Sequence, residues 1–460
     1  MGWTYTIGEL AKAVGVAAPA AKGFFHAVST DTRTLEPGSV FFALKGERFD
    51  GNAFVSEAFA KGAVAAVTSV SHDAGPCLIV SDPLAALQKF ARWHRSRYSL
   101  SLVAITGSCG KTSSKDMIAA VLAKRYRVVK TKGNLNNEIG CPISLLEIDD
   151  ATEKAVVEMG AAHRGDIAHL CDLAQPTEAA VTMVSPAHLE GFGSIQNVAA
   201  AKGEIVEALP ADGVFYVNMD DEWCVKMGEK FPGKKVRYGT AGDIVLESCV
   251  RESSGEFRLQ VRPVGELCLP LPSRAHVWNA LLAIAVGMQH GIGMRHGVCE
   301  SPRYFEEPLR EACAFSSRFR ILKVGDIEII DDAYNANPTS MAAALEALVE
   351  RPANKRAAAI GDMLELGAES PTYHRRIGER AGELGVNYVF ARGEHAEKVV
   401  EGAKSRGVEH AAVIQNPEEM ADAIRSILEP GDALLVKGSR GMRMEKVIDA
   451  LKNALERNNT

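Results

Sequence analysis

Short apolar runs of strand length alternate with helix-length amphipathic segments along most of the chain. In the middle of the sequence, Leu100–Thr106, Ala155–Glu158, Ala179–Val184 and Val214–Asn218 predict strands, and Ser113–Arg125 predicts a helix. Strands that are apolar at successive positions are buried on both faces, which is typical of parallel sheets covered by helices. We therefore expect a mainly parallel sheet in this region.

The same alternation recurs in the last third of the chain. The predicted strands are Ile327–Ile330, Ala357–Ile360, Tyr388–Ala391, Ala411–Ile414 and Ala433–Val436. The helical stretches between them include Ser340–Glu350, Pro371–Leu384 and Pro417–Ile427. This pattern predicts a Rossmann-like unit, in which ligands bind beyond the carboxyl ends of the strands. Residues that directly follow a strand are therefore the candidates for function.

The first hundred residues have a weaker pattern of the same kind. Gly38–Leu44 and Ala63–Val67 predict strands, and Phe54–Lys61 and Leu84–Tyr98 predict helices. A chain of 460 residues is long enough for about three domains. We expect an α/β protein with a small N-terminal α/β domain (residues 1–97), a central phosphate-loop domain with a mainly parallel sheet (98–313) and a C-terminal Rossmann-like domain (314–460).

Composition narrows the classes of partner. The net charge of −6 argues against a general nucleic-acid or acidic-membrane partner, both of which attract basic surfaces. The N-terminal residues lack the basic and apolar regions of a secretory signal, and no apolar run reaches the roughly 18 residues of a membrane helix. Nine cysteines without metal-type spacing suggest reduced thiols. We expect a cytoplasmic protein that binds neither nucleic acid nor membrane.

The segment Thr106–Thr112 (TGSCGKT) lies between a predicted strand and a predicted helix, and it predicts a phosphate-binding loop. Glycines let backbone N–H groups turn onto phosphate oxygens, and the helix N-terminus adds positive charge. Lys111 would reach the terminal phosphates and the Thr112 hydroxyl would ligate Mg²⁺. Ile105 stands where the usual pattern has its first glycine, so this is a compact variant, and the alternative is a tight strand–helix turn. The predicted ATP-binding residues here are Thr106, Gly107, Ser108, Cys109, Gly110, Lys111, Thr112 and Ser113.

Three further side chains follow in suggestive positions. Glu158 ends an apolar strand, where a carboxylate would be costly to bury unless it bound a metal; the alternative is an exposed strand end. His188 follows another apolar strand, but a lone histidine is more often a satisfied polar residue than a ligand. Lys202 lies in a helical pattern, where the simplest interpretation is a solvated side chain.

Together these segments resemble the Mur ligases, the ATP-dependent amide-forming enzymes of peptidoglycan synthesis, over nearly the whole chain. The segments that carry the resemblance are Thr106–Thr112, Thr131–Pro142, Glu158–Ala161, Ala187–Ser194, Ala201–Ile205, Asp331–Met341, Gly361–Gly367 and Val436–Arg440. Asp331–Met341 (DDAYNANPTSM) and Gly361–Gly367 (GDMLELG) look most like the members that add D-alanyl-D-alanine to UDP-N-acetylmuramoyl-tripeptide. The resemblance implies that reaction, through an acyl phosphate, with ATP and one or two Mg²⁺ ions, in a cytoplasmic monomer.

The resemblance also implies roles for particular residues. The implied catalytic residues are Lys111, Lys202, His188 and Arg318, and the implied metal ligands are Thr112, Glu158, His188 and Lys202, the last as a possible carbamate. Beyond the loop, the implied ATP-binding residues are Asn279, Arg318, Asp332, Tyr334 and Asn335. The implied residues for the UDP-muramoyl substrate are Ser29, Asp31, Arg33, Thr131, Asn136, Asn137, Lys437, Ser439 and Arg440. Asp362 and Glu365 are expected to receive the ammonium group of the dipeptide.

Several choices stay open at this point. Arg320 is as basic as Arg318, and His276 is displaced by one position from the histidine that the family usually has. A ligase with another acceptor, such as a folylpolyglutamate synthase or a different Mur step, is a second hypothesis. A phosphate-loop regulator that binds nucleotide without ligation is a third hypothesis, which explains Thr106–Thr112 but not Glu158, His188 and Asp332 in their motif settings.

Overall fold

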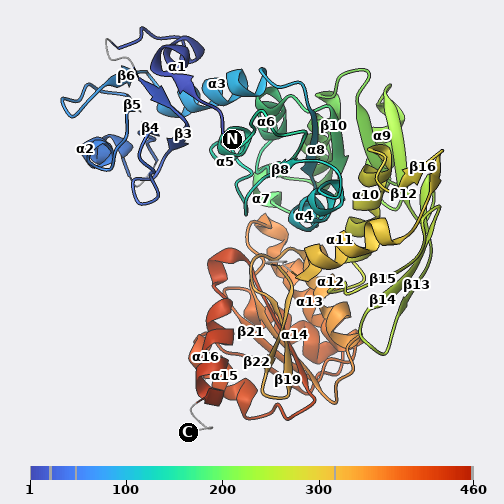
Figure 1. The fold of residues 1–460 in the computed structure, drawn as a ribbon. Coiled ribbons are helices and arrows are strands. Elements are labelled where there is room, and N and C mark those ends of the chain that lie inside the picture. The colour runs from blue at the N-terminus through green and yellow to red at the C-terminus, as the bar shows by residue number, and fades with distance from the viewer. Residues whose placement is uncertain (1, 20–22, 47–48, 315–317, 457–460) are drawn as a thin grey trace.

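The computed structural model describes residues 2–19, 23–46, 49–314 and 318–456. The outer ends of the predicted N- and C-terminal domains, at residues 1 and 457–460, lie outside the described residues. Three larger sheets of four, nine and six strands follow one another along the chain and occupy three parts of the molecule, with the N-terminal part at one end and the C-terminal part at the other (Figure 1).

The N-terminal part is built on a parallel four-stranded sheet in the order β3-β4-β5-β6. Its strands are β3 (Ala27–Ser29), β4 (Ser39–Phe42), β5 (Ala65–Thr68) and β6 (Cys77–Ile79). The short pair β1 (Tyr5–Thr6) and β2 (Phe24–Phe25), the helices α1 (Ile7–Val14) and α2 (Val55–Ala60) and the 3₁₀ turn η1 (Gly51–Phe54) complete it. Helix α1 begins where the Thr6 hydroxyl accepts from the Glu9 N–H and the Glu9 carboxylate accepts from the Thr6 N–H, which is a capping box.

Helix α3 (Pro83–Arg95) joins this part to the next. It packs against β4 and β5 on one side and against α5 and α6 of the central part on the other. Phe90 and Leu87 of α3 lie in one continuous apolar cluster with Trp3 and with Ile205 of the central part. The N-terminal part is therefore anchored by buried apolar surface as well as by the chain itself.

The central part contains a nine-stranded sheet in the order β15-β14-β13-β12-β11-β10-β7-β9-β8. The strands are β7 (Ser101–Thr106), β8 (Val128–Lys130), β9 (Lys154–Glu158), β10 (Glu178–Val181), β11 (Val214–Asn218), β12 (Lys234–Gly239), β13 (Ile244–Arg251), β14 (Phe257–Arg262) and β15 (Gly265–Leu269). Pairing is parallel from β8 to β13 and antiparallel from β13 to β15. A separate antiparallel pair joins β16 (Met294–Arg295) and β17 (Val298–Cys299).

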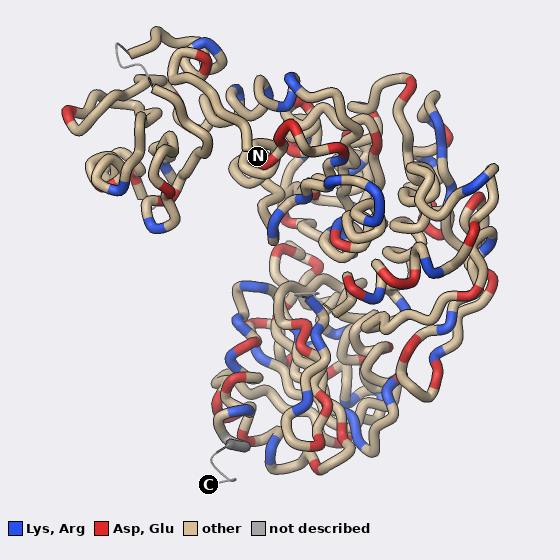
Figure 2. The backbone as a smooth tube through the Cα atoms, viewed as in Figure 1, with Lys and Arg blue, Asp and Glu red and all other residues tan. Residues whose placement is uncertain are grey.

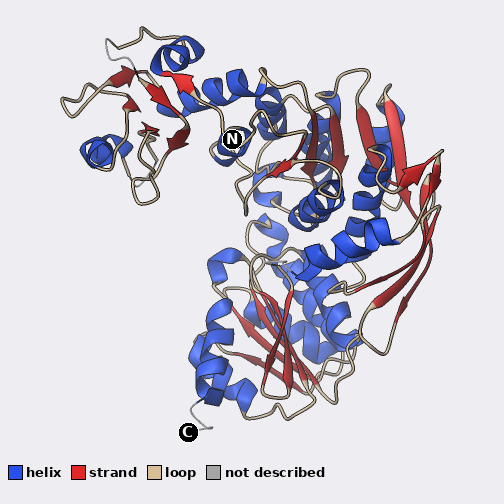
Figure 3. Ribbon diagram, in the orientation of Figure 1, coloured by secondary structure: helices blue, strands red, loops and turns tan. Residues whose placement is uncertain are grey.

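Helices cover both faces of this sheet (Figure 3). Alternate residues of β7 show the reason: Leu102 and Ala104 pack into one apolar cluster, and Val103 and Ile105 pack into another on the opposite face. The first face carries α6 (Asp166–Ala174) and α8 (Ile195–Glu207), and the second carries α4 (Lys111–Leu122), α10 (His276–Gln289) and α11 (Arg303–Ala314). The remaining helices are α5 (Gly140–Leu145), α7 (Leu189–Phe192) and α9 (Glu222–Lys230).

The C-terminal part has a six-stranded sheet in the order β18-β19-β23-β20-β21-β22, parallel except for the edge pair β18–β19. The strands are β18 (Arg320–Val324), β19 (Ile327–Asp332), β20 (Arg356–Gly361), β21 (Tyr388–Arg392), β22 (His410–Val413) and β23 (Ala433–Lys437). One face packs on α12 (Pro338–Val349), α13 (Ser370–Glu383) and α14 (Ala396–Ser405), and the other on α15 (Pro417–Arg425) and α16 (Glu445–Glu456). The 3₁₀ turns η2 (Gly367–Glu369) and η3 (Arg440–Met442) follow strands.

The expected α/β class with mainly parallel sheets is confirmed. The strand expected at Val214–Asn218 is β11 with the same bounds, and other predicted elements shift by a few residues. The antiparallel extension β14–β15 was not predicted. Acidic and basic residues are interspersed along the chain (Figure 2), and across the described ranges no helix combines the length and apolarity that a bilayer crossing needs.

Candidate active site

The loop after β7 has the conformation that its glycines permit. Gly107 has φ 147° and Gly110 has φ 81°, both in the region that L side chains rarely adopt. A Cβ atom on Gly107 would lie 1.8 Å from Thr182 Oγ1, and one on Gly110 would lie 2.6 Å from Asn279 Oδ1. Only glycine fits at either position, so the close approach of these neighbours explains why the sequence carries both.

Residues that follow neighbouring strands of the central sheet form hydrogen bonds with this loop. The Ser108 hydroxyl donates to the Ser185 carbonyl at 2.8 Å, and the Thr106 hydroxyl donates to the Met159 carbonyl at 2.9 Å. Lys111, at the start of α4, donates from Nζ to the Gly107 carbonyl at 2.7 Å. Burial lowers the pKa of Lys111, and the nearby Glu158 carboxylate opposes that shift. The lysine therefore folds back over the loop, where a phosphate would replace its carbonyl partner.

Glu158, the last residue of β9, lies beside this loop. Its side chain is fully buried, so the alternative of an exposed strand end is wrong. It accepts hydrogen bonds from the Thr112 hydroxyl at 2.8 Å and the Asn136 amide at 2.7 Å, and Lys115 Nζ lies 4.0 Å away. The Thr131 hydroxyl accepts from the Glu158 backbone N–H at 3.0 Å. The arrangement holds a carboxylate and a hydroxyl, both hard oxygen donors, next to the phosphate loop.

A pocket of about 340 Å³ brings several predicted residues together. Lys111, Asn136, Asn137, Glu158, His188, Lys202, Arg318, Tyr334 and Asn335 line it. Lys202 is only 2% exposed, so the interpretation as a solvated helix residue is wrong. Within the described part of the chain it has no hydrogen-bond or ion-pair partner, and burial, with a contribution from nearby Lys111, lowers its pKa to about 7.

His188 lines the same pocket but pairs elsewhere. Its Nδ1 contacts a carboxylate oxygen of Glu365 from the C-terminal part, and the Glu190 N–H donates to the Glu365 carbonyl at 3.0 Å. Its backbone has φ 53°, which turns the chain sharply after β10. Among the residues that the structure describes, no three His, Cys, Asp or Glu side chains gather closely enough to hold a metal ion. Glu158 and His188 therefore share a pocket without forming part of such a group.

A second pocket, of about 470 Å³, lies on the other side of the loop. Ser108, Cys109, Gly110, Thr112, Ser113, His276, Asn279, Asp332 and Lys437 are among its lining residues. Arg318, Tyr334 and Asn335 line both pockets, and the Arg318 guanidinium lies 4.1 Å from the centre of the Tyr334 ring. Arg320 instead pairs with Asp331 and lines neither pocket, so the structure distinguishes the two arginines.

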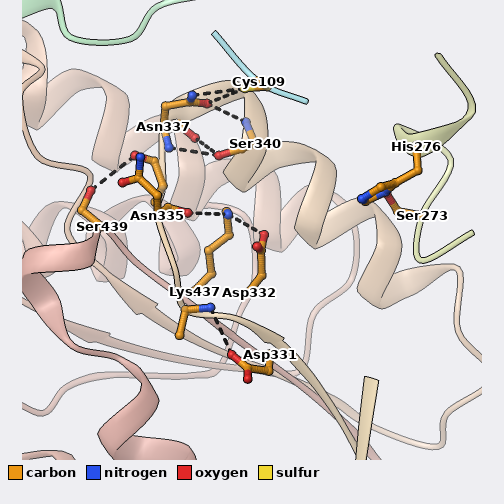
Figure 4. Close-up of polar contacts among 12 residues, drawn as sticks. Cys109, Ser273, His276, Asp331, Asp332, Asn335, Asn337, Ser340, Lys437 and Ser439 are labelled. Atoms are coloured by element: carbon orange, nitrogen blue, oxygen red, sulfur yellow. Dashed lines mark hydrogen bonds and ion pairs between the residues drawn. The ribbon is translucent and has the colours of Figure 1, made fainter. Parts of the chain in front are cut away.

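The far wall of this second pocket contains a buried ion pair (Figure 4). Lys437 Nζ contacts the Asp332 carboxylate and donates to the Asn335 carbonyl at 2.8 Å. Burial raises the pKa of Asp332, and Lys437 opposes that shift. His276 shares a hydrogen bond with Ser273 at 2.9 Å, and burial lowers its pKa to about 4, so the ring is neutral.

Other predicted residues do not line either pocket. Ser29, Asp31 and Arg33 are in the N-terminal part, where the Arg33 guanidinium bonds to Asp31 and lowers the pKa of that carboxyl to about 2. Thr131 and Ser439 are buried, and Arg440 pairs with Glu445 at 3.1 Å. None of these six lines either pocket.

The two residues expected to receive an ammonium group already have protein partners. Asp362 is 4% exposed and accepts from the Glu394 N–H at 2.7 Å, while Glu365 contacts His188. The pockets also contain residues that the sequence did not single out, notably Asp166 and His169 in the first and Trp278 and Asn337 in the second. Only Asn337 carried a local signal, because an asparagine before proline is typical of a helix N-cap.

Comparison with known proteins gives matches over most of the chain. Residues 24–91 match the Mur ligase family, catalytic domain; residues 105–287 match the Mur ligase middle domain; and residues 317–440 match the Mur ligase, glutamate ligase domain. The chain is 38% identical over 437 residues to the UDP-N-acetylmuramoyl-tripeptide–D-alanyl-D-alanine ligase of Escherichia coli K12, with 93% of each chain covered.

Solved structures agree with this similarity. A crystal structure of MurF from Acinetobacter baumannii superposes with a TM-score of 0.88 at 30% identity and covers 98% of this chain and 99% of that one. MurF from Thermotoga maritima in complex with ADP superposes with a TM-score of 0.81 at 28% identity, covering 94% of this chain and 98% of that one.

Proposed function

The chain belongs to the Mur ligase family, and we propose that it is an ATP-dependent, ADP-forming ligase that adds D-alanyl-D-alanine to UDP-N-acetylmuramoyl-tripeptide. The relative from Escherichia coli carries that activity in its name and aligns over nearly all of both chains. The observation that carries the proposal within this structure is the meeting of two pockets at one phosphate loop, between the central and C-terminal parts.

The two pockets suit two kinds of reactant. We place ATP in the larger pocket, with its base near Asn279 and its phosphates on the loop, and the Thermotoga maritima relative was crystallised with ADP. Lys111, which we expect to contact the terminal phosphate, lines only the smaller pocket. The terminal phosphate would therefore lie where the two pockets meet. The tripeptide carboxylate and the dipeptide amine would then occupy the smaller pocket.

The reaction proceeds in two steps that a closed site favours. A carboxylate oxygen attacks the γ-phosphorus, the bond to the β,γ-bridging oxygen breaks, and ADP leaves with that electron pair. The dipeptide nitrogen then attacks the acyl carbon of the acyl phosphate, inorganic phosphate leaves, and the amine proton passes to solvent. Lys111 and Arg318 supply positive charge where the phosphoryl oxygens gather, and exclusion of water protects the acyl phosphate.

The residues present fit a magnesium ion. Thr112 and Glu158 are oxygen donors of the type that Mg²⁺ prefers, and the buried Glu158 carboxylate lies beside the loop. Bound there, the ion would neutralise charge on the phosphate oxygens. We propose Thr112 and Glu158 as its ligands, with His188 and Lys202 lining the same pocket for a second ion.

Lys202 is suited to carbamylation. Its amine is buried without a partner among the described residues, and a pKa of about 7 leaves much of it unprotonated near neutral pH, which is the form that attacks CO₂. The nitrogen would bond to the carbon of CO₂ and release a proton, giving an anionic oxygen ligand. Labelled ¹³C-bicarbonate should give a carbamate signal in NMR that Lys202→Ala abolishes. An active enzyme without that signal would exclude the modification.

We further propose that the enzyme works as a cytoplasmic monomer and that its domains comprise residues 1–97, 98–313 and 314–460. The roles of Ser29, Asp31, Arg33, Asn136 and Asn137 in holding the UDP-muramoyl peptide belong to the same proposal. Thr131, Ser439 and Arg440 would act from behind the pockets, because their side chains line neither.

One experiment tests the proposed function directly. Phosphate release is measured with a matrix of UDP-muramoyl peptides against single amino acids and dipeptides. The proposal expects turnover with the tripeptide and D-alanyl-D-alanine. Turnover with single amino acids alone would indicate a different ligase, and ATP hydrolysis that ignores both acceptors would indicate a regulator. Lys111→Ala should lower turnover by at least about 100-fold, while Lys226→Ala, at an exposed ion pair with Glu222, should not.

A further inference from the structure

Asn337 begins helix α12 and also touches the phosphate loop. Its Oδ1 accepts a hydrogen bond from the Ser340 N–H at 2.8 Å, and its own backbone N–H donates to the Ser340 hydroxyl at 3.0 Å. These two hydrogen bonds form a capping box at the N-terminus of α12. Pro338 at the first helical position fixes the direction in which the helix leaves. The asparagine is therefore held firmly by its own domain.

The carboxamide of Asn337 reaches across to the central part (Figure 4). Its Nδ2 lies 3.3 Å from the Ser108 carbonyl and 3.1 Å from Cys109 Sγ, and the Cys109 thiol lies 3.3 Å from Oδ1. These residues are more than 200 positions apart in the chain. One side chain thus joins the N-terminus of α12 to the peptide between Ser108 and Cys109.

The central part fixes the Ser108 side chain and the two peptide units that flank the Ser108–Cys109 peptide. The Ser108 N–H donates to the Met183 carbonyl at 2.9 Å, the Ser108 hydroxyl donates to the Ser185 carbonyl, and the Thr182 hydroxyl donates to the Cys109 carbonyl. The Ser108 carbonyl is the group of this peptide that receives its hydrogen bond from the C-terminal part. Its orientation fixes that of the Cys109 N–H, because the two groups belong to one planar peptide unit.

We propose that Asn337 is a positioning residue that sets the orientation of the Ser108–Cys109 peptide when the C-terminal part docks, and thereby aims the loop at the phosphates of ATP. A carboxamide suits this task because it offers a donor and an acceptor together. The consequence for catalysis rests on the proposed ligase function, but the contact with Cys109 does not.

A serine at position 337 separates the two roles. Serine is a good N-cap and is uncharged, so Asn337→Ser keeps α12 capped but removes the amide that reaches Ser108 and Cys109. Asn416 supplies a matched control, because it caps α15, accepts from the Glu418 N–H at 2.8 Å and also precedes a proline. Asn416→Ser repeats the chemical change at a helix start that lines neither pocket.

Steady-state kinetics on the full chain test the effect on catalysis. Asn337→Ser should lower kcat by about tenfold, the effect of one lost hydrogen bond that acts in the transition state. The KM for UDP-muramoyl-tripeptide and the Tm should stay at wild-type values, as should all parameters of Asn416→Ser. A wild-type kcat in Asn337→Ser would overturn the proposal, because only the cap would then matter.

Labelling of Cys109 tests the contact without any turnover. The full chain, free of nucleotide, is treated with iodoacetamide, and the Cys109 and Cys249 peptides are quantified by mass spectrometry. Cys249 is partly exposed and serves as the internal reference. Asn337→Ser should label Cys109 several-fold faster than wild type, with Cys249 unchanged and Asn416→Ser equal to wild type. Equal Cys109 rates would overturn the proposal, whereas a wild type that ligates no substrate would refute only the proposed function.

Discussion

At Asp332 two opposing effects act on one carboxylate. Burial raises its pKa, and Lys437, which is itself 1% exposed, lowers it through a direct contact. Because the raising effect dominates, the folded state holds this proton more tightly than the unfolded state does. The contribution of Asp332 to the free energy of unfolding therefore falls as pH rises from the unfolded pKa through the folded pKa.

Removal of the lysine should enlarge this effect. We expect Lys437→Met to lower the free energy of unfolding by about 3 kcal/mol at pH 8, because it leaves a buried carboxylate unpaired. The pKa of Asp332 rises further in that variant, so the deficit should shrink as pH falls toward 5. Thermal unfolding from pH 5 to 8 measures both effects. The double variant with Asp332→Asn and Lys437→Met should regain much of the lost free energy of unfolding and should lose the pH dependence. If the double variant keeps the full deficit, altered packing and not the unpaired charge is responsible.

Without the family resemblance, residue patterns identify residues of the site mainly where reactive side chains lie at or just beyond the ends of strands. Glu158 ends one predicted strand and Thr112 follows another across the phosphate loop, and the parallel pairing of β7 with β9 brings their side-chain oxygens within 2.8 Å. His188 also follows a strand, but its partner Glu365 lies 177 positions away, in the loop after β20 of the C-terminal part. No local pattern reports such a contact, since it depends on how two domains dock.

At the scale of elements, the edge of the central sheet shows a similar limit. Phe257, Leu259 and Val261 alternate with Arg258 and polar residues along β14, and their burial alternates in step. This period of two is the signal of a strand with one solvated face, which a search for continuous apolar runs passes over. The central strands β7 and β11 were predicted because they are buried on both faces.

Helix α3 contains a buried histidine, His94, that links it to two neighbouring segments. Its ring is fully buried, accepts from the Tyr5 hydroxyl at 2.9 Å through Nδ1 and donates to the Ile148 carbonyl at 2.8 Å through Nε2. Both nitrogens are satisfied in the neutral ring, and burial lowers the pKa of His94 from 6.5 to about 4. The neutral histidine thus joins β1, α3 and the segment that follows α5, and protonation of the ring in acid would disrupt this link.

The anchorage of α3 should therefore weaken in mild acid. The folded state binds fewer protons here than the unfolded state between pH 6.5 and 4, so stability is complete above this window and falls by about 3 kcal/mol across it. His94→Asn should be less stable at pH 8 but should lose less between pH 7 and 5 than wild type does. Thermal unfolding at several pH values measures the slopes, with His296→Asn, at an exposed histidine, as the control. Parallel slopes in wild type and His94→Asn would contradict the assignment.

At the scale of the whole molecule, the proposed reactants must span three parts. The two pockets lie between the central and C-terminal parts, whereas Ser29, Asp31 and Arg33 belong to the N-terminal part. That part lies on the other side of α3 (Figure 1). Arg33 is 85% exposed, and its hydrogen bonds to Asp31 hold it in place. An exposed, oriented guanidinium is suited to a phosphate group remote from the reacting carboxylate.

Arg33 should therefore bind the UDP substrate equally well in the ground state and in the transition state, and should not affect the chemical step. We expect Arg33→Ala to raise the KM for UDP-muramoyl-tripeptide by about tenfold, the value of one charge-assisted hydrogen bond, with kcat and the KM for ATP unchanged. Lys12→Ala removes an exposed cation from α1 of the same domain and should change none of these constants. A muramoyl tripeptide without its UDP group should react equally with wild type and Arg33→Ala, because the missing phosphates are the proposed partner. A fall in kcat with an unchanged KM for the UDP substrate would contradict this role, and would indicate that Arg33 acts on a step after substrate binding.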